Sequence, residues 1–225
     1  MILNKDSCKY IVVDFDGTLF KWNSFKIWIV FLFLFSWTYL GIRSYLKKLF
    51  ELFNFIYLRK INELDHYEFK LNIQKTFCID SYENSSFSVF FTFLLKFGIR
   101  KKLINYLIEQ RQVKNRKVIL ATAAPVEYIN PFAISLKIFD FVSATPRHKS
   151  DNLFDNINYQ KFKNVKEIIF GSKKNFSDFE MHSDHADDMP LILASKVSVL
   201  YPPLSNQIDG IERSENIIIH YKNFL

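Results

Sequence analysis

The chain has 225 residues, which is enough for one α/β core with a modest insertion but too few for two full domains of ordinary size. It contains only two cysteines, Cys8 and Cys78, which excludes a disulfide framework and a thiolate zinc site and favours a reducing, cytoplasmic location. The net charge of +7 suits an anionic partner, such as a phosphate ester, anionic lipid headgroups or nucleic acid.

The first predicted element is a short strand that ends at two carboxylates. Residues 11–13 are a β-branched run, and Asp14, Asp16 and Gly17 follow it. Such a run indicates a buried parallel strand, and active sites of open α/β sheets lie at the carboxyl ends of such strands. Two neighbouring carboxylates repel each other unless a cation or a shared proton compensates them. The pattern favours a divalent metal site, although a strand ending in a solvated Asp-Gly turn has the same pattern.

No long apolar segment precedes Asp14, so we expect no cleavable signal peptide. Residues 21–99 are predicted to form an all-helical insertion, and an apolar helix is expected at 27–42. Residues 27–41 include no charged side chain, but a transmembrane helix usually needs about 20 apolar residues. Three interpretations stay open: a helix buried in the insertion, an interfacial or re-entrant membrane helix, and a true membrane span.

The segment after the apolar helix combines basic and aromatic residues. Basic side chains at 43, 47, 48, 59 and 60 alternate with leucines, phenylalanines and an isoleucine. This pattern is typical of a helix that lies on anionic lipid, although a helix packed on its neighbours with solvated lysines has a similar sequence. A helical pattern continues over residues 64–99.

Strands and helices alternate after the insertion. The pattern predicts helices at 101–112, from 126 to about 136, at 162–170 and at 190–195, and strands at 117–121, 178–182 and 197–201. This alternation predicts an α/β fold with a doubly wound parallel sheet. We expect residues 1–20 and 100–225 to form this core and residues 21–99 to form the insertion.

Three predicted strand ends have polar residues that would meet at one edge of the sheet. They are Asp14 and Asp16, then Thr122, then Asp184 and Asp188. The motifs Asp-x-Asp-x-Thr at 14–18 and Asp-x-x-x-Asp at 184–188 resemble those of the haloacid dehalogenase-like hydrolase superfamily. Residues 183–191 look like the subfamily related to phosphoserine phosphatase, which has a helical cap just after the first motif. The resemblance covers about residues 9–20 and 100–203, and the cap matches only in position and helical character.

The resemblance implies a Rossmann-like core and a role for each motif residue. Asp14 would be the nucleophile that forms an aspartyl phosphate, and Asp16 would protonate the leaving oxygen and then activate water. Mg²⁺ would be held by Asp14, Asp16, Asp184 and Asp188, with Asp188 binding either a metal-bound water or a lysine. Thr122 would contact a phosphoryl oxygen at the start of a helix, although a threonine there is also a common helix cap.

The resemblance also implies a lysine before the last motif that neutralises phosphate and nucleophile. Two registers of the predicted helix fit, one with Lys161 and one that leaves Lys163 adjacent to the site. Either lysine could instead lie on a solvated helix face. Gly17, Thr18 and Ala123 are expected to bind substrate, whereas Asn23, His182 and His185 are interpreted as structural residues or as residues at the substrate's edge.

The sequence therefore predicts a Mg²⁺-dependent phosphomonoester phosphatase whose cap selects the substrate. One candidate substrate is a lipid phosphate, reached by a protein that is cytoplasmic or peripheral on the inner face of a membrane. The alternatives are a small soluble phosphate, such as a sugar phosphate or phosphoserine, and a non-catalytic membrane-associated binding protein on this fold. No base-reading motif is present, so we expect no nucleic-acid partner.

Overall fold

The core of the protein is one parallel sheet whose strand order reverses beside the first strand. The computed structural model describes residues 8–37, 41–77, 86–146, 155–170, 178–204 and 217–220. Six strands of this part pair in the order β3-β2-β1-β4-β5-β6, and every pair is parallel. Their bounds are β1 (Tyr10–Val13), β2 (Lys117–Pro125), β3 (Phe141–Thr145), β4 (Phe179–Ser183), β5 (Val197–Leu200) and β6 (Ile217–His220).

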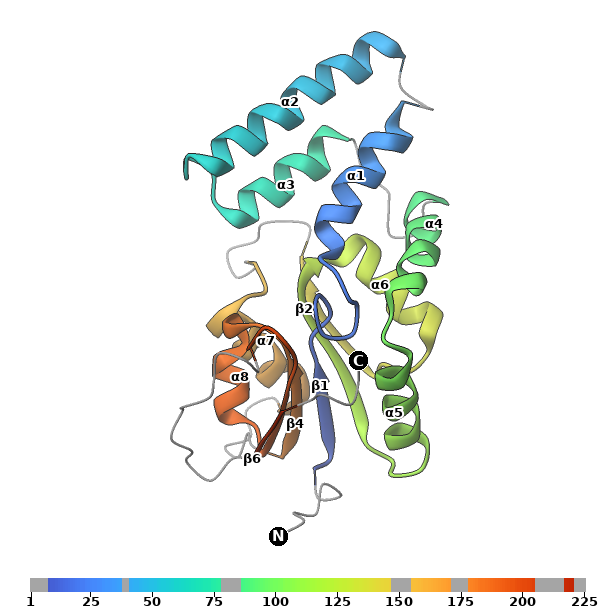
Figure 1. The fold of residues 1–225 in the computed structure, drawn as a ribbon, viewed down its shortest axis with the longest axis vertical. Coiled ribbons are helices and arrows are strands. Elements are labelled where there is room, and N and C mark those ends of the chain that lie inside the picture. The colour runs from blue at the N-terminus through green and yellow to red at the C-terminus, as the bar shows by residue number, and fades with distance from the viewer. Residues whose placement is uncertain are drawn as a thin grey trace.

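The central strand β1 is buried on both faces. Ile11 and Val13 pack in one hydrophobic cluster and Val12 packs in the other, and all three side chains are fully buried. Helices α5 (Lys101–Gln112) and α6 (Val126–Leu136) lie on one side of the sheet, and α7 (Asn158–Phe170) and α8 (Met189–Ala194) lie on the other (Figure 1). This confirms the predicted doubly wound α/β core.

The segment between β1 and α5 is helical and leaves and re-enters the core at one point. Its helices are α1 (Ser24–Ser36), α2 (Ile42–Lys60), α3 (His66–Thr76) and α4 (Ser86–Leu95), followed by the short η3 (Lys96–Gly98). Phe20 forms an antiparallel bridge with Ile99, and Arg100 N donates to Leu19 O at 2.9 Å. Figure 1 shows α1, α2 and α3 above the carboxyl edge of the sheet, whereas α4 lies against α6.

The apolar stretch predicted at 27–42 is shorter as a helix than expected. It forms α1, which ends at Ser36, and a second helix begins at Ile42. One face of α1 is buried: the Trp28 ring lies 4.6 Å from Phe91 and 5.4 Å from Tyr128, centroid to centroid. Within the described ranges, no helix has the length and apolar character needed to cross a membrane.

The core differs from the prediction at the end of one strand and by one additional strand. The strand predicted at 117–121 continues as β2 to Pro125. Thr122 was predicted to lie at the start of a helix, but it lies inside this strand. The pairing of β2 with β3 shifts register between Ala121 and Pro125, which lets the backbone of Thr122–Ala124 depart from the ladder. Strand β6 was missed, and Cys78 lies outside the described residues.

Candidate active site

A tight turn after β1 brings the first motif against the last one. Asp14 N donates to His182 O at 2.9 Å, so the end of β1 is still tied to β4. Gly17 follows in a left-handed conformation with φ +77°, and a Cβ at this position would collide with the Asp184 carboxylate. Thr18 Oγ1 donates to Asp184 Oδ1 at 2.9 Å. In the structure Gly17 and Thr18 therefore position Asp184, and their contacts with substrate stay a prediction.

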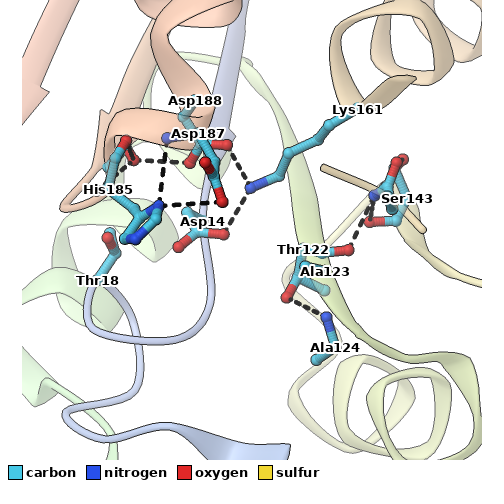
Figure 2. Close-up of polar contacts among 12 residues, drawn as sticks. Asp14, Thr18, Thr122, Ala123, Ala124, Ser143, Lys161, His185, Asp187 and Asp188 are labelled. Atoms are coloured by element: carbon cyan, nitrogen blue, oxygen red, sulfur yellow. Dashed lines mark hydrogen bonds and ion pairs between the residues drawn. The ribbon is translucent and has the colours of Figure 1, made fainter. Parts of the chain in front are cut away.

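Lys161 joins the nucleophile candidate to the last motif. Its Nζ lies 2.7 Å from Asp14 Oδ1 and 2.6 Å from Asp188 Oδ1, and all three residues are buried. Ser183 Oγ donates to the other oxygen of Asp188, Oδ2, at 2.6 Å. Figure 2 shows Lys161 reaching across from α7 to the ends of β1 and β4. Lys163 is exposed, so of the two candidate lysines the structure places Lys161 beside Asp14.

Burial is the main influence on the charges of these groups. It raises the pKa of Asp14 well above the ordinary value, Lys161 opposes this, and the carboxylates of Asp188 and Asp184 add to it. Burial also disfavours the charged form of Lys161, but the attraction of Asp14 and Asp188 outweighs it and raises the lysine pKa. Lys161 is therefore a permanent cation between two carboxylates.

Asp16 has an environment of its own, two residues after Asp14. Burial raises its pKa to about 6, although Ser24 N donates to its Oδ1 at 2.8 Å and stabilises the charged form. Repulsion from Asp184 contributes less than burial. The carboxyl group can thus hold and release a proton near neutral pH, which is the property that a general acid and base needs.

Thr122 and Ala123 are fixed by contacts from both sides of the sheet edge. Thr122 is buried, its Oγ1 accepts from Ala124 N at 3.0 Å, and its carbonyl accepts from Asn156 Nδ2 at 2.8 Å. The hydroxyl proton of Thr122 is not used in the Ala124 contact and remains available to a ligand. The carbonyl of Ala123 accepts from Thr145 Oγ1 at 2.8 Å.

These residues line a cavity of about 580 Å³ between the sheet edge and the helical segment. All predicted site residues except Thr18 and Lys163 are among its lining residues. The helical segment and its linker contribute Lys21, Trp22, Asn23, Arg59 and His66. Asn23 also caps α1 by accepting from Lys26 N at 2.9 Å.

The two histidines near the last motif differ in role. His182 is buried, with Nε2 2.8 Å from Glu180 Oε1 and Nδ1 3.0 Å from Tyr201 Oη, which fits the structural interpretation. His185 is exposed, lines the cavity and contacts Asp187 at 3.3 Å.

Sequence reasoning missed a buried ion pair between the helical segment and the core. Lys70 on α3 donates to Asp155 Oδ1 at 2.6 Å and to the carbonyl of Ala123 at 2.7 Å. His66 Nδ1 lies 2.6 Å from Asp155 Oδ2. Burial opposes the charge on Asp155, but His66 and Lys70 together lower its pKa to about 2. The only sequence signal was a lysine on the inward face of α3, among Tyr67, Ile73 and Gln74.

The donor set at the sheet edge fits a hard divalent cation that keeps several water or substrate ligands. In the part of the chain that the structure describes, no three His, Cys, Asp or Glu side chains gather as a metal-ligand cluster. Both oxygens of Asp188 are used by Lys161 and Ser183, which agrees with the lysine-binding alternative predicted for it. Asp14 and Asp184 each use one oxygen, Oδ1, in a side-chain contact. Mg²⁺ is commonly bound by one or two carboxylates together with phosphate oxygens and water.

Comparison with known proteins finds solved structures with a similar fold, but no protein family or curated protein with a matching sequence. No family model and no curated protein matches the chain. A solved structure from Bordetella pertussis Tohama I, described as a protein with unknown function, has 15% identity and a TM-score of 0.69 over 97% of this chain and 100% of that one.

Two further solved structures are described as hydrolases. The first is a probable phosphoserine phosphatase from Vibrio cholerae, with 11% identity and a TM-score of 0.55 over 96% of this chain and 62% of that one. The second is a haloacid dehalogenase family hydrolase from Salmonella enterica serovar Typhi, with 11% identity and a TM-score of 0.50 over 88% and 65%. The chain therefore has the haloacid dehalogenase-like fold that its two aspartate motifs predicted.

Proposed function

We propose that the protein is a Mg²⁺-dependent phosphatase that hydrolyses phosphate monoesters through an aspartyl phosphate on Asp14. The observation that supports this most is the buried bridge from Asp14 through Lys161 to Asp188 in a cavity that Asp184 also lines. The bridge aligns one carboxylate with a cation at the carboxyl end of β1, where a phosphoryl group can meet both.

The reaction has two steps. In the first, an Asp14 oxygen forms a bond to phosphorus while the bond to the leaving oxygen breaks, and Asp16 gives its proton to that oxygen. In the second, Asp16 takes a proton from water, the water oxygen attacks phosphorus, and the Asp14 carboxylate leaves with the bonding electrons. Lys161 and the Thr122 hydroxyl stabilise the phosphoryl charge in both steps.

A divalent cation held by Asp14 and Asp184 would supply Lewis-acid polarisation of the phosphoryl oxygens. The residues present do the rest: Gly17 allows Asp184 to approach, Thr18 orients it, and Ser183 and Lys161 hold Asp188.

Two substrate classes fit the proposal, one argued from the surface of the helical segment and one from the cavity wall. A lipid phosphate is favoured by the exposed apolar side chains of the helical segment, Val30, Leu34 and Trp37 among them, which could meet an acyl chain or a membrane. A small soluble phosphate with a second anionic group is favoured by Lys21, Arg59 and His66 on the cavity wall. The third alternative is a non-catalytic binding protein. It does not explain why Asp16, two residues after Asp14, has a pKa of about 6, which suits a general acid and base.

The test is hydrolysis by the purified protein of an aryl phosphate, a phosphatidylglycerophosphate-type lipid phosphate, phosphoserine and sugar phosphates, with Mg²⁺ or with a chelator. We expect Mg²⁺-dependent turnover of at least one of them, reduced by Asp14→Asn by at least about 10³-fold. Asp140→Asn is the matched control, because Asp140 pairs with Arg111 at 3.2 Å next to the opposite end of the strands. If no substrate is hydrolysed in a Mg²⁺-dependent way, the proposal is wrong.

A further inference from the structure

Helix α2 exposes a continuous apolar stripe. Large apolar side chains occur at Ile42, Leu46, Phe50, Phe53 and Tyr57, and each of these residues is 54–77% exposed. The spacing of four, four, three and four residues places them on one face of an α-helix. We call these five residues the α2 stripe. Scattered exposed leucines are ordinary in proteins, but an aligned row of five is not.

A second face of α2, which begins beside the stripe, accounts for the packing of the helix. Leu52 is buried, Tyr45, Leu49 and Phe55 are half-buried, and α3 is the neighbour against which α2 packs. Figure 1 shows α2 at the far end of the molecule from the amino-terminal edge of the sheet, with α3 on the side nearer the core. Within the described ranges, no element covers the α2 stripe.

Positive charge lies next to the α2 stripe. Arg43 precedes Leu46 by three residues and Lys47 precedes Phe50 by three, so each basic side chain neighbours the stripe on the helix surface. Both are exposed, and α2 contains five basic residues but only one acidic residue, Glu51. An exposed apolar face with basic residues at its border is the arrangement that binds at the boundary between headgroups and acyl chains of an anionic bilayer.

We propose that α2 docks the protein on anionic lipid bilayers, with its long axis parallel to the membrane plane and the α2 stripe inserted among the acyl chains. The helix has 19 residues, which at 1.5 Å per residue gives a contact about 28 Å long. Arg43 and Lys47 would lie at the depth of the lipid phosphates. The proposal concerns binding only and does not rest on the phosphatase activity proposed above.

The charge decides between lipid and a second protein chain as the occupant. A stripe with this spacing could also pack against the same stripe of another copy. In a parallel pair Arg43 and Lys47 would then face their own like-charged counterparts, and in an antiparallel pair the Arg43 end of one helix would face the basic Lys60 end of the other. A bilayer that contains anionic lipid meets both the apolar stripe and its basic border with complementary chemistry. We therefore commit to the bilayer, and self-association is a competing outcome of the test.

The test is co-sedimentation of the full chain with phosphatidylglycerol vesicles and with phosphatidylcholine vesicles at low and at high salt. We expect binding to phosphatidylglycerol that weakens as salt rises, and at least about tenfold weaker binding to phosphatidylcholine. The double variant Phe50→Glu/Phe53→Glu should lower the partition coefficient at least about tenfold. Val113→Glu/Ile134→Glu is its matched control, because it adds the same two charges at core residues that are 71% and 72% exposed, at the end of α5 and on α6.

A second pair of variants tests the charge. Arg43→Gln/Lys47→Gln should lower binding to phosphatidylglycerol and leave the weak binding to phosphatidylcholine unchanged, whereas Lys9→Gln/Lys101→Gln removes the same charge from exposed core sites and should change binding much less. Thermal unfolding of all variants checks that each is folded.

Three results would overturn the proposal. In the first, the protein stays in the supernatant with phosphatidylglycerol vesicles at low salt. In the second, the wild type and the Phe50→Glu/Phe53→Glu variant bind these vesicles equally. In the third, the wild type does not bind vesicles but is a dimer in sedimentation equilibrium, and the Phe50→Glu/Phe53→Glu variant is a monomer. Turnover of a soluble aryl phosphate, measured separately, reports on the proposed function. Vesicle binding without turnover would retain the docking surface and reject the phosphatase.

Discussion

At the residue scale, Lys161 has both a structural and an electrostatic role, and substitution of Lys161 can be compared with the same substitution at Lys163. Lys161 is buried between Asp14 and Asp188 and is the cation that keeps these carboxylates compatible. Without it, the pKa of the buried Asp14 carboxyl would rise further, which favours the protonated form over the charged form that the proposed attack on phosphorus needs. The lysine is thus both a structural and an electrostatic partner of Asp14.

We expect Lys161→Met to reduce kcat for an aryl phosphate by about 10²-fold or more, because one buried donor to the phosphoryl group and nucleophile is lost. The free energy of unfolding should change as well, since removing one partner of a buried ion pair costs about 3–5 kcal/mol. Lys163→Met is the matched control from the same helix and should leave both kcat and the urea midpoint close to the wild-type values. Equal loss of activity in the two variants would contradict the placement of Lys161.

The choice between Lys161 and Lys163 could not be made from the sequence, whereas the two aspartate motifs could be recognised from it. The two aspartate motifs could be placed because strand, turn and carboxylates are adjacent in the sequence, and adjacent residues have a fixed geometry. Lys161 and Lys163 are both on α7, and which one points at Asp14 depends on where the helix begins and how it lies on the sheet. The strand β2 extends through Thr122 for a similar reason, because pairing of Pro125 with Thr145 is a contact between distant residues.

At the scale of elements, α3 is bonded to the core through buried polar groups. Lys70 donates to Asp155 and to the backbone of β2, and His66 contacts the same carboxylate. These residues are about 85 positions apart in the sequence, and no local pattern links them. The contacts of Lys70 hold α3 over the cavity and so fix the position of His66, which lines the cavity wall.

Lys70→Met should therefore lower the free energy of unfolding by about 3 kcal/mol, because Asp155 and the Ala123 carbonyl would lose a buried cation. We also expect KM to rise more than kcat falls, because the wall of the cavity is displaced while Asp14 and Lys161 keep their contacts. Lys75→Met on the same helix is the control, since Lys75 is exposed. Urea unfolding and steady-state kinetics measure the two effects, and an unchanged urea midpoint for Lys70→Met would contradict this role.

At the scale of the whole molecule, a second buried ion cluster crosses the sheet. Glu180 on β4 is fully buried, 2.8 Å from Arg116 and 2.8 Å from His182, and it accepts from Tyr106 Oη at 2.7 Å. Burial opposes its charge, but His182, Arg116 and Tyr106 outweigh burial and lower the pKa of Glu180 to about 2. The cluster ties α5 and β4 to Arg116, the residue that precedes β2.

This lowered pKa predicts how stability depends on acid. A carboxyl with a lower pKa in the folded state adds stability above its unfolded pKa of about 4.5, and this stability is lost as pH falls toward 2. Glu180→Gln should be less stable than wild type by about 3 kcal/mol at pH 7, and the difference should shrink toward zero near pH 2. Urea unfolding at a series of pH values measures this, with Glu109→Gln, a change at an exposed residue of α5, as control. A difference that does not depend on pH would contradict it.

The position of β1 determines when the active site can exist during synthesis. Tyr10 at the start of β1 pairs with Lys117 on one side and with Phe179 on the other, so both neighbours of this strand are encoded far downstream. Contacts of such high sequence separation form late, whereas the hydrogen bonds within α2 and its packing against α3 join residues that are close in the sequence. A growing chain therefore presents α2 and its apolar stripe to its surroundings long before Asp14 meets Asp184 and Lys161, and a chain that stops before β4 cannot bring Asp14 beside Asp184.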